Sequence, residues 1–426
     1  MRTLRLLFVC LVGSLALVAC DSMEETLQAP MEKEGAADDR APAGDKKVTE
    51  ARRDQDEPAA EMVIEETPPP PASKKTGTKT KMRKFDIGVG EKEFHRVKVF
   101  YGTNRKQTGS EEANEFFGTE RGAMTYGFCE VTIPLIHKAG ALEKPKWWKF
   151  EFSEDPKKHV VLQKVNPLSW SALSLQLNQV LAQSSGKNAF VFVHGFNVHF
   201  KDAARRTAQI HHDLKFDGAP MFFSWPSRGE IAITSYTHDE TSAKWSYSYL
   251  KEFLIKVATD TEADNIYLIA HSMGTRVLAN AVSHVMNERP DLKKRFREII
   301  LAAPDIDTEV FINDLAPKLV RASRNTTLYA SSNDKALKTS KEVHGGYPRA
   351  GDAGEDLIIL PGIDTIDASA VDSSLLGLGH SYFAEAGSVL RDIKELVGLS
   401  KPASQRTYLL PKKRPIDGQV FFVVKQ

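Results

Sequence analysis

The residue with the clearest chemical potential is Ser272, which stands in the sequence AHSMG at 270–274. The apolar run 265–270 predicts a buried strand, and the run 275–286 has the spacing of a helix. A serine on a tight turn between strand and helix exposes its hydroxyl at the edge of a sheet and can act as a nucleophile. The alternative is that Ser272 only begins a helix. Ala270 stands where glycine is usual, and it adds only a methyl group.

A motif nearer the N-terminus could stabilise the negative charge that such a nucleophile creates. The run 189–193 predicts a buried strand and ends in the sequence HGFN at 194–197. An HG element after an early strand offers one backbone N–H to an oxyanion, and the residue after the nucleophile offers another. These donors would be Phe196 and Met273, and each could lower the barrier by roughly 3–4 kcal/mol. We expect His194 to fix the loop by hydrogen bonding and not to react.

An acid and a base follow Ser272 in chain order. Asp334 comes after the strand-like run 326–330, and His380 comes in a loop after the strand-like run 357–360. In this order His380 would take the proton from Ser272, while Asp334 would hold the imidazole in the correct tautomer.

Other residues could fill the same two roles. His344 is the rival base, in a glycine-rich stretch at 344–347. Asp305 and Asp307 are rival acids, because both follow the strand-like run 298–302. Both also suit a different role as helix-capping carboxylates before Thr308.

The sequence offers no metal site and no cofactor motif. His211, His212 and His238 lack the spacing of metal ligands, and there is no HExxH motif and no cysteine cluster. We therefore predict that the protein uses no metal and no cofactor. The formal net charge of +1 gives no reason to expect nucleic acid as a partner.

Together, the serine turn, the HG element and the order of acid and base resemble the α/β-hydrolase superfamily. The chain is most similar to an uncharacterised bacterial family within it. That family is marked here by VFYGTNR at 99–105, by YG at 126–127 leading to VTIP at 131–134, and by SSND at 331–334. The resemblance covers about residues 90 to 398. It implies an α/β-hydrolase fold with Ser272, Asp334 and His380 as a triad, and it implies no substrate.

Periodicity independently predicts an α/β fold with a mostly parallel central sheet and helices on both faces. Apolar strands and amphipathic helices alternate from residue 169, with helices at 169–183, 201–214, 241–259 and 308–321 and with strands at 189–193, 219–224 and 265–270. Earlier strand-like runs, at 97–101, 128–134, 149–152 and 160–162, predict antiparallel leading strands. The run 419–424 predicts an edge strand. Only about one helix fits where a lid would be, so we expect little or no lid, with cover from the loop after Trp225 or from 341–355.

The N-terminus predicts a lipoprotein signal peptide at 1–19. Arg2 and Arg5 precede an apolar run, 6–19, that is short for a membrane span. The run ends in LVAC at 17–20, which resembles a lipobox and implies lipidation of Cys20 after cleavage. An ordinary cleaved signal peptide is the alternative. The prediction places the protein in a bacterial cell envelope, anchored to a membrane and facing the periplasm, with the choice between inner and outer membrane open.

Composition divides the rest of the chain. Residues 20–84 have no aromatic residue and many charged residues and prolines, which predicts a disordered tether spanning about 40–50 Å. Residues 85–426 form the predicted hydrolase domain, with leading strands at 85–165, a catalytic core at 166–398 and a C-terminal extension at 399–426. Only Cys129 lies in this domain, so no intrachain disulfide is expected there.

The resulting hypothesis is a membrane-tethered serine hydrolase that cleaves a carboxylic ester through an acyl-enzyme. Its partners would be a small-molecule, lipid or polymeric ester and, through the lipid anchor, a membrane. Peptidase, amidase or thioesterase chemistry could use the same triad. A second hypothesis, of a different class, is a non-catalytic envelope lipoprotein that uses the fold as a binding scaffold.

Overall fold

The computed structural model describes residues 93–146, 150–230, 233–371 and 387–425. The chain divides into two units, Met1–Lys84 and Phe85–Gln426. The predicted signal peptide, Cys20 and the tether lie outside the described residues, and so does His380. None of the helices in the described ranges is both long and apolar enough to span a bilayer.

The second unit is built on one sheet of eleven strands, in the order β10-β11-β9-β8-β7-β6-β4-β5-β1-β2-β3. Its central strands run parallel to one another. They are β4 (Asn188–Val193), β5 (Gly218–Ser224), β6 (Asn265–His271), β7 (Phe296–Ala302), β8 (Ser323–Ala330) and β9 (Asp364–Asp367). These strands are nearly continuous apolar runs because helices cover both faces.

The first three strands extend the sheet at one side. β1 (Phe94–Gln107) pairs in parallel with β5 and antiparallel with β2 (Phe117–Pro134), and β2 pairs antiparallel with β3 (Val161–Leu168). The predicted antiparallel leading strands are confirmed. The register places Thr103 of β1 opposite Ser224 at the end of β5. The C-terminal part of β1 therefore lies at the same end of the sheet as the C-terminal ends of β4, β5 and β6.

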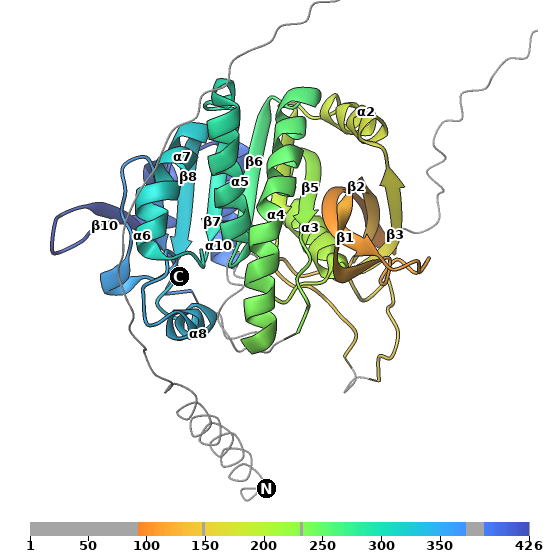
Figure 1. Ribbon diagram of the computed structural model, residues 1–426, viewed down its shortest axis with the longest axis horizontal. Coiled ribbons are helices and arrows are strands. Elements are labelled where there is room, and N and C mark those ends of the chain that lie inside the picture. Colours follow the sequence, from red (N-terminus) through yellow and green to blue (C-terminus); the bar gives the residue numbers. More distant parts are fainter. Residues whose placement is uncertain (1–92, 147–149, 231–232, 372–386, 426) are drawn as a thin grey trace, which may run out of the picture. The chain divides into compact units, whose positions relative to one another are not determined.

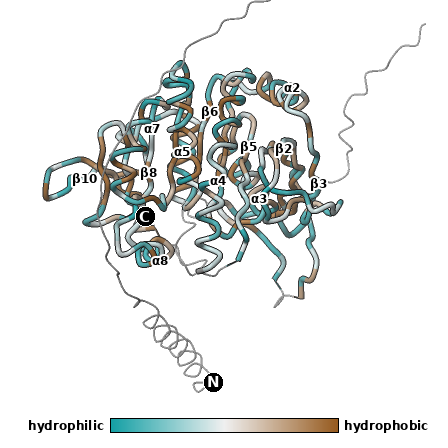
Figure 2. The backbone as a smooth tube through the Cα atoms, in the orientation of Figure 1, coloured by the Kyte–Doolittle hydropathy of each residue, from teal (hydrophilic) through white to brown (hydrophobic). Residues whose placement is uncertain are grey.

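Helices cover the two faces of this sheet (Figure 1). One face packs against α2 (Trp170–Leu181), α4 (Ile233–Asp260), α5 (Gly274–Glu288) and α7 (Ala316–Ala322), and the other packs against α3 (Phe200–Leu214) and α10 (Gly387–Leu399). Shorter helical segments are η2 (Pro290–Leu292), α6 (Thr308–Val310), η3 (Phe311–Leu315), α8 (Lys335–Val343), η4 (Gly354–Asp356) and η6 (Ala403–Gln405). Figure 2 shows the hydrophobic stretches concentrated in the strands and in the inner sides of the helices. The predicted α/β fold is confirmed.

Two predicted strands are wrong. In the run 149–152, Phe150 lies in a turn at φ 58° and is 82% exposed, and the two residues after it are not in a strand. The run 357–360 is irregular, and the strand comes later, as β9. Leu357 and Ile358 are buried, and the Thr365 hydroxyl donates to the Ile358 carbonyl at 2.7 Å. The strand was predicted in the wrong place because a buried irregular segment has the same apolar composition as a buried strand.

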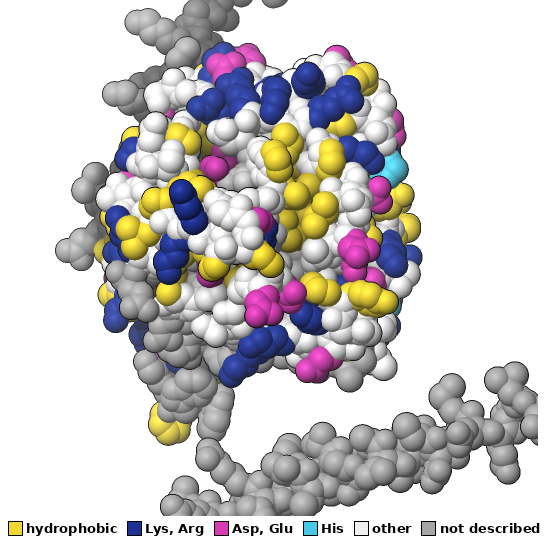
Figure 3. All heavy atoms as spheres, turned by 90° about the vertical axis from the view of Figure 1, so that its left-hand side faces the viewer, with side chains coloured by type: hydrophobic (Ala, Val, Ile, Leu, Met, Phe, Trp, Pro, Cys, Tyr) yellow, Lys and Arg dark blue, Asp and Glu magenta, His cyan; other side chains and the backbone are white. Residues whose placement is uncertain are grey.

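The predicted edge strand at 419–424 is also corrected. β11 (Val420–Val424) lies between β9 and β10 (Leu409–Lys413), so β10 forms the edge. Lys412 and Lys413 are exposed on β10, which discourages pairing with another chain. Figure 3 shows the face on this side of the molecule, where hydrophobic side chains are interspersed with charged ones.

Candidate active site

Ser272 lies on a tight turn between β6 and α5, as the sequence predicts. Its φ of 53° is in the left-handed region, which is uncommon for a residue other than glycine. Its N–H donates to the Ala302 carbonyl at 3.0 Å, and its own carbonyl accepts from the Thr275 hydroxyl at 2.6 Å. The strained turn is held at both ends and fixes the place of the serine side chain.

Two glycines allow the loop after β4 to approach this turn closely. A Cβ on Gly274 would lie 2.2 Å from the His194 carbonyl oxygen. A Cβ on Gly195 would lie 2.9 Å from the Cβ of Ser272. The methyl group of Ala270, in contrast, is buried in the core and meets no such constraint. The HG element and the serine turn are thus in direct contact, and this close approach explains why glycine is needed at 195 and 274.

The two predicted oxyanion donors lie on the two sides of this contact. Among the described residues, neither the N–H of Phe196 nor that of Met273 donates to a backbone carbonyl. Within the described ranges, neither N–H is taken up by the backbone, as an oxyanion donor requires. The ring of Phe196 packs edge-on against Tyr236, with 5.4 Å between centroids, so Tyr236 at the start of α4 contributes to the surroundings of the site.

A buried arginine, which the sequence analysis did not select, holds the segments beside the HG element. Arg105 is 1% exposed. Its Nη1 donates to the carbonyls of Gly118 at 3.0 Å and Ser227 at 3.1 Å, and its Nη2 donates to the Val198 carbonyl at 2.7 Å. Its Nε donates to the Ser224 hydroxyl at 2.8 Å. The available signal was a charged residue near the end of an apolar strand, within the sequence VFYGTNR at 99–105.

His194 is a buried, neutral part of the same group. Its Nδ1 donates to the Gly195 carbonyl at 2.9 Å, and its Nε2 lies 3.1 Å from the Ser224 hydroxyl. Its ring stacks on Trp225 at 5.1 Å. Burial and the nearby Arg105 guanidinium lower the pKa of His194 to about 3, so the ring is neutral at physiological pH. These contacts agree with the predicted role of fixing the loop.

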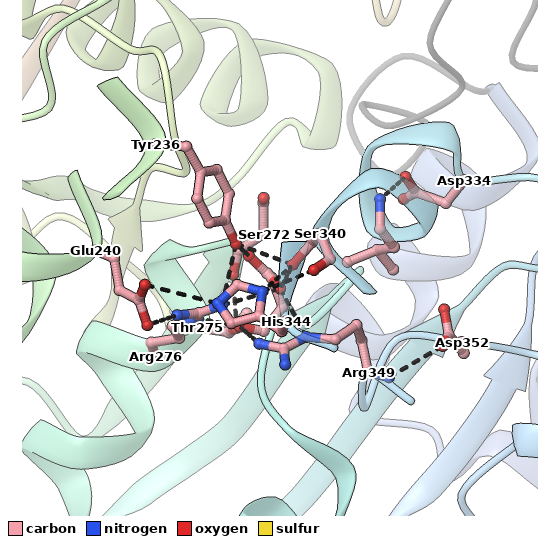
Figure 4. Close-up of polar contacts among 12 residues, drawn as sticks. Tyr236, Glu240, Ser272, Thr275, Arg276, Asp334, Ser340, His344, Arg349 and Asp352 are labelled. Carbon is pink, nitrogen blue, oxygen red and sulfur yellow. Dashed lines mark hydrogen bonds and ion pairs between the residues drawn. The ribbon is translucent and has the colours of Figure 1, made fainter. Parts of the chain in front are cut away.

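Asp334 is buried and caps the N-terminus of α8. Its Oδ1 accepts from the N–H groups of Ala336 and Leu337, both at 3.0 Å (Figure 4). A carboxylate held in this way has a fixed position after β8, where the acid is expected. Its predicted partner, His380, lies outside the described residues, so the pairing of acid and base stays a prediction.

Asp305, one of the rival acids, is the centre of a buried cluster. Its carboxylate accepts from the Tyr236 hydroxyl at 2.5 Å, from the Ser340 hydroxyl at 2.6 Å and from Arg349 Nε at 3.0 Å. Arg276 Nη2 lies 3.2 Å from it. Burial alone would raise the pKa of Asp305, but the Arg276 and Arg349 guanidiniums hold it well below its usual range. This carboxylate is fully engaged by four donors.

The other two rivals are also engaged. Asp307 caps α6, where it accepts from the N–H groups of Glu309 at 3.0 Å and Val310 at 3.2 Å. His344 ends α8, where its Nδ1 donates to the Ser340 carbonyl at 2.7 Å and its Nε2 lies 3.6 Å from the Glu240 carboxylate. Figure 4 shows His344 grouped with Tyr236, Ser340 and Arg276. Tyr236 belongs to α4, and its ring lies 5.7 Å from that of His344. Cover of the site by the loop after Trp225 or by 341–355 stays a prediction.

The described part of the chain holds no group of three or more His, Cys, Asp or Glu side chains arranged to bind a metal ion. A hydroxyl on a strained turn, two N–H groups without a backbone acceptor among the described residues and a buried cation beside the HG element suit the attack on a carbonyl carbon.

Comparison with known proteins places this arrangement in a family. Residues 170–398 match the family described as an alpha/beta hydrolase of unknown function (DUF900). No curated protein matches the sequence.

Solved structures that are similar include an esterase, rPPE, in complex with (S)-Ac-CPA. It is 10% identical, with a TM-score of 0.27, over 73% of this chain and 83% of that one. A structure from a study of two fungal esterases from Rhizomucor miehei is 12% identical, with a TM-score of 0.28, over 74% of this chain and 83% of that one. A structure from a study of two prolyl endopeptidases is 12% identical, with a TM-score of 0.25, over 66% of this chain and 36% of that one. We take no substrate from these likenesses.

Proposed function

Because this chain belongs to the family of alpha/beta hydrolases of unknown function, we propose that it is a serine hydrolase that cleaves carboxylic esters through an acyl-enzyme on Ser272. The observation that carries the proposal is the contact between the serine turn and the HG element. This contact supports the proposal because it joins a strained serine to the loop of Phe196, and the N–H groups of Phe196 and Met273 have no backbone acceptor among the described residues.

The reaction would proceed in two halves. The Ser272 oxygen attacks the ester carbonyl carbon while His380 takes the hydroxyl proton, and the carbonyl oxygen becomes an oxyanion bound by the N–H groups of Phe196 and Met273. The intermediate collapses, the C–O bond to the alcohol breaks, and the alcohol leaves with the proton from His380. Water, deprotonated by His380, then attacks the acyl-enzyme and releases the acid, and Ser272 regains its proton. Asp334 would hold the His380 ring and stabilise its charged form.

The test is covalent labelling of the full-length protein in detergent with a fluorophosphonate probe. We expect wild type to label and Ser272→Ala not to label. Ser283→Ala, which changes a buried serine within the helix α5 that follows Ser272, serves as the control and should label like wild type. Folded wild-type protein that does not label, or labelling that persists in Ser272→Ala, would contradict the proposal.

The type of acyl bond is tested by comparing substrates. A p-nitrophenyl ester should give a burst of p-nitrophenol, because acylation would be faster than deacylation for an activated ester. A p-nitroanilide with the same acyl group should react far more slowly. A faster reaction with the anilide would point to peptidase or amidase chemistry on the same triad.

We also propose that Cys20 anchors the enzyme to a membrane of the cell envelope, on the strength of its lipobox-like surroundings. Mass spectrometry of the mature N-terminus should find Cys20 first and carrying acyl chains. Cys20→Ser should move the protein from the membrane fraction to the soluble fraction. An unmodified N-terminus would support an ordinary cleaved signal peptide instead.

A further inference from the structure

The hydrogen bonds around His194 have fixed directions because of the chemistry of their partners. The Gly195 carbonyl can only accept, so Nδ1 of His194 carries the ring proton. Nε2 of this neutral ring must then accept. The Ser224 hydroxyl lies 3.1 Å from Nε2, and it already accepts from Arg105 Nε at 2.8 Å, so its own proton is available to donate to the ring. The bonds run in one direction, from the Arg105 guanidinium to the backbone.

This series of hydrogen bonds ends at the Gly195 carbonyl, whose peptide unit also carries a predicted oxyanion donor. The Gly195 carbonyl and the Phe196 N–H belong to the same planar peptide unit. A hydrogen bond to the carbonyl oxygen therefore fixes the direction of the N–H on the other side. It also polarises the peptide and makes the N–H a stronger donor, as in other hydrogen-bond chains.

Arg105 is suited to start such a chain because its charge is not cancelled at short range. Each of its hydrogen-bond acceptors in the described structure is an uncharged carbonyl, hydroxyl or imidazole group. Burial lowers its pKa to about 9, with Asp239 and Asp202 acting in the opposite direction, so it remains charged at neutral pH. The Val198 carbonyl, bound at 2.7 Å, ties the same guanidinium to the other end of the HG loop.

We propose that Arg105 and Ser224 are positioning residues for the oxyanion hole. They act through His194, which orients and polarises the peptide that carries the Phe196 N–H. This inference rests on the proposed function, since it assigns the residues that prepare one of its two oxyanion donors.

The kinetic test uses Ser224→Ala in the full-length protein, with Ser323→Ala as the matched control. Both serines are fully buried and both hydroxyls have two hydrogen-bond partners, but Ser323 begins β8, away from the serine turn. We expect kcat for a p-nitrophenyl ester to fall about 10- to 100-fold in Ser224→Ala, with KM little changed, because one donor is weakened and not removed. Binding of an arylboronic acid, which forms a tetrahedral adduct, should weaken by a similar factor.

The control variant separates the proposed role from a purely structural one. We expect Ser323→Ala to lower the melting temperature about as much as Ser224→Ala does, and to leave kcat unchanged. Equal kcat in the two variants, or a change confined to KM, would overturn the proposal.

A second measurement does not depend on catalytic activity. In the wild-type protein labelled with [15N]histidine, NMR should find one ring with its proton on Nδ1 that does not titrate between about pH 5 and 8. In Ser224→Ala the Nε2 signal of that ring should shift, because its nearer donor is lost and only Arg105 Nη2, at 3.5 Å, remains. A His194 ring with its proton on Nε2, or one that titrates in this range, would overturn the relay even if the enzyme hydrolyses esters. An inactive wild type with the Nδ1–H ring would instead contradict the proposed function alone.

Discussion

Two buried charged groups lie on either side of Ser272, and they differ in whether their hydrogen-bond partners carry the opposite charge. Asp305, on the side of α8, meets the guanidiniums of Arg276 and Arg349. Arg105, on the side of the HG element, meets only uncharged groups at hydrogen-bond distance. The compensated charge joins segments of the chain. Arg105 has no carboxylate among its hydrogen-bond acceptors in the described structure, although Asp239 and Asp202 raise its pKa. It lies beside the HG element, where the proposed reaction would develop a negative charge.

The energetics of the two sites differ accordingly. Removing one partner of a buried ion pair leaves the other charge exposed to a low dielectric and is strongly destabilising. Burying a lone cation carries a desolvation penalty that hydrogen bonds to carbonyls only partly offset. A group that is costly to bury and lies beside reacting atoms is more readily explained by function than by stability.

The largest expected effect is a loss of kcat when Asp334, the proposed acid, is replaced. Asp334→Ala should lower kcat by about 10³- to 10⁴-fold, because the histidine would lose its tautomer and its charge partner. Asp307→Ala is a matched control, since both carboxylates cap a helix through two N–H groups. Each variant should lose about 1 kcal/mol of stability. If kcat falls no more in Asp334→Ala than in Asp307→Ala, Asp334 is only a cap and the acid lies elsewhere.

The second effect is on stability. Asp305→Asn should lower the free energy of unfolding by about 3–5 kcal/mol, because Arg276 and Arg349 are left without their counter-charge. Urea denaturation measures this loss, and kcat per folded molecule should change little. Asp417→Asn, in a surface pair with Arg414, should leave stability nearly unchanged. A large loss of kcat with normal stability would reverse the roles assigned to the two charged groups.

The third effect concerns the contact that both charged groups flank. Gly195→Ala would place a Cβ 2.9 Å from the Cβ of Ser272, so the loop or the serine must move. A displacement of this kind should lower kcat by about 100-fold. Gly398→Ala, which meets no atom within 4 Å at the end of α10, should leave kcat unchanged. Wild-type kcat in Gly195→Ala would show that the loop tolerates the shift.

The smallest effect is at a compensated charge far from Ser272. His137 lies 2.9 Å from the Glu143 carboxylate and 2.8 Å from the Asp213 carboxylate. Burial would lower its pKa, but hydrogen bonds to Asp213 and Glu143 raise it to about 9. The stabilisation should be complete below the unfolded pKa of about 6.5 and be lost as pH rises through 9.

We therefore expect the free energy of unfolding of wild type to exceed that of His137→Asn by about 1–2 kcal/mol near pH 6, after solvent screening. The difference should shrink above about pH 9, and kcat should be equal in both proteins at about pH 7. A difference that does not change with pH would show that the ring is neutral in the folded protein.

Local patterns in the sequence were sufficient for most of the core. The strand before Ser272 and the helix after it were predictable because apolar spacing and a terminal glycine specify both. Arg105 was not predictable, because its acceptors are Gly118, Val198, Ser224 and Ser227, and only the tertiary fold brings these together. Chain order predicts the acid after β8, at Asp334, but no periodicity in the sequence constrains the position of His380 relative to it.

The position of β1 has a consequence for the boundaries of the domain. The family match covers 170–398, whereas β1 is inserted between β5 and β2 and carries Arg105. A protein cut to the matched range would leave β5 as an open edge, and β9 would lose β11 on the other side. Unpaired sheet edges invite association with other chains. The segment outlined by sequence similarity is therefore smaller than the sheet that the fold requires.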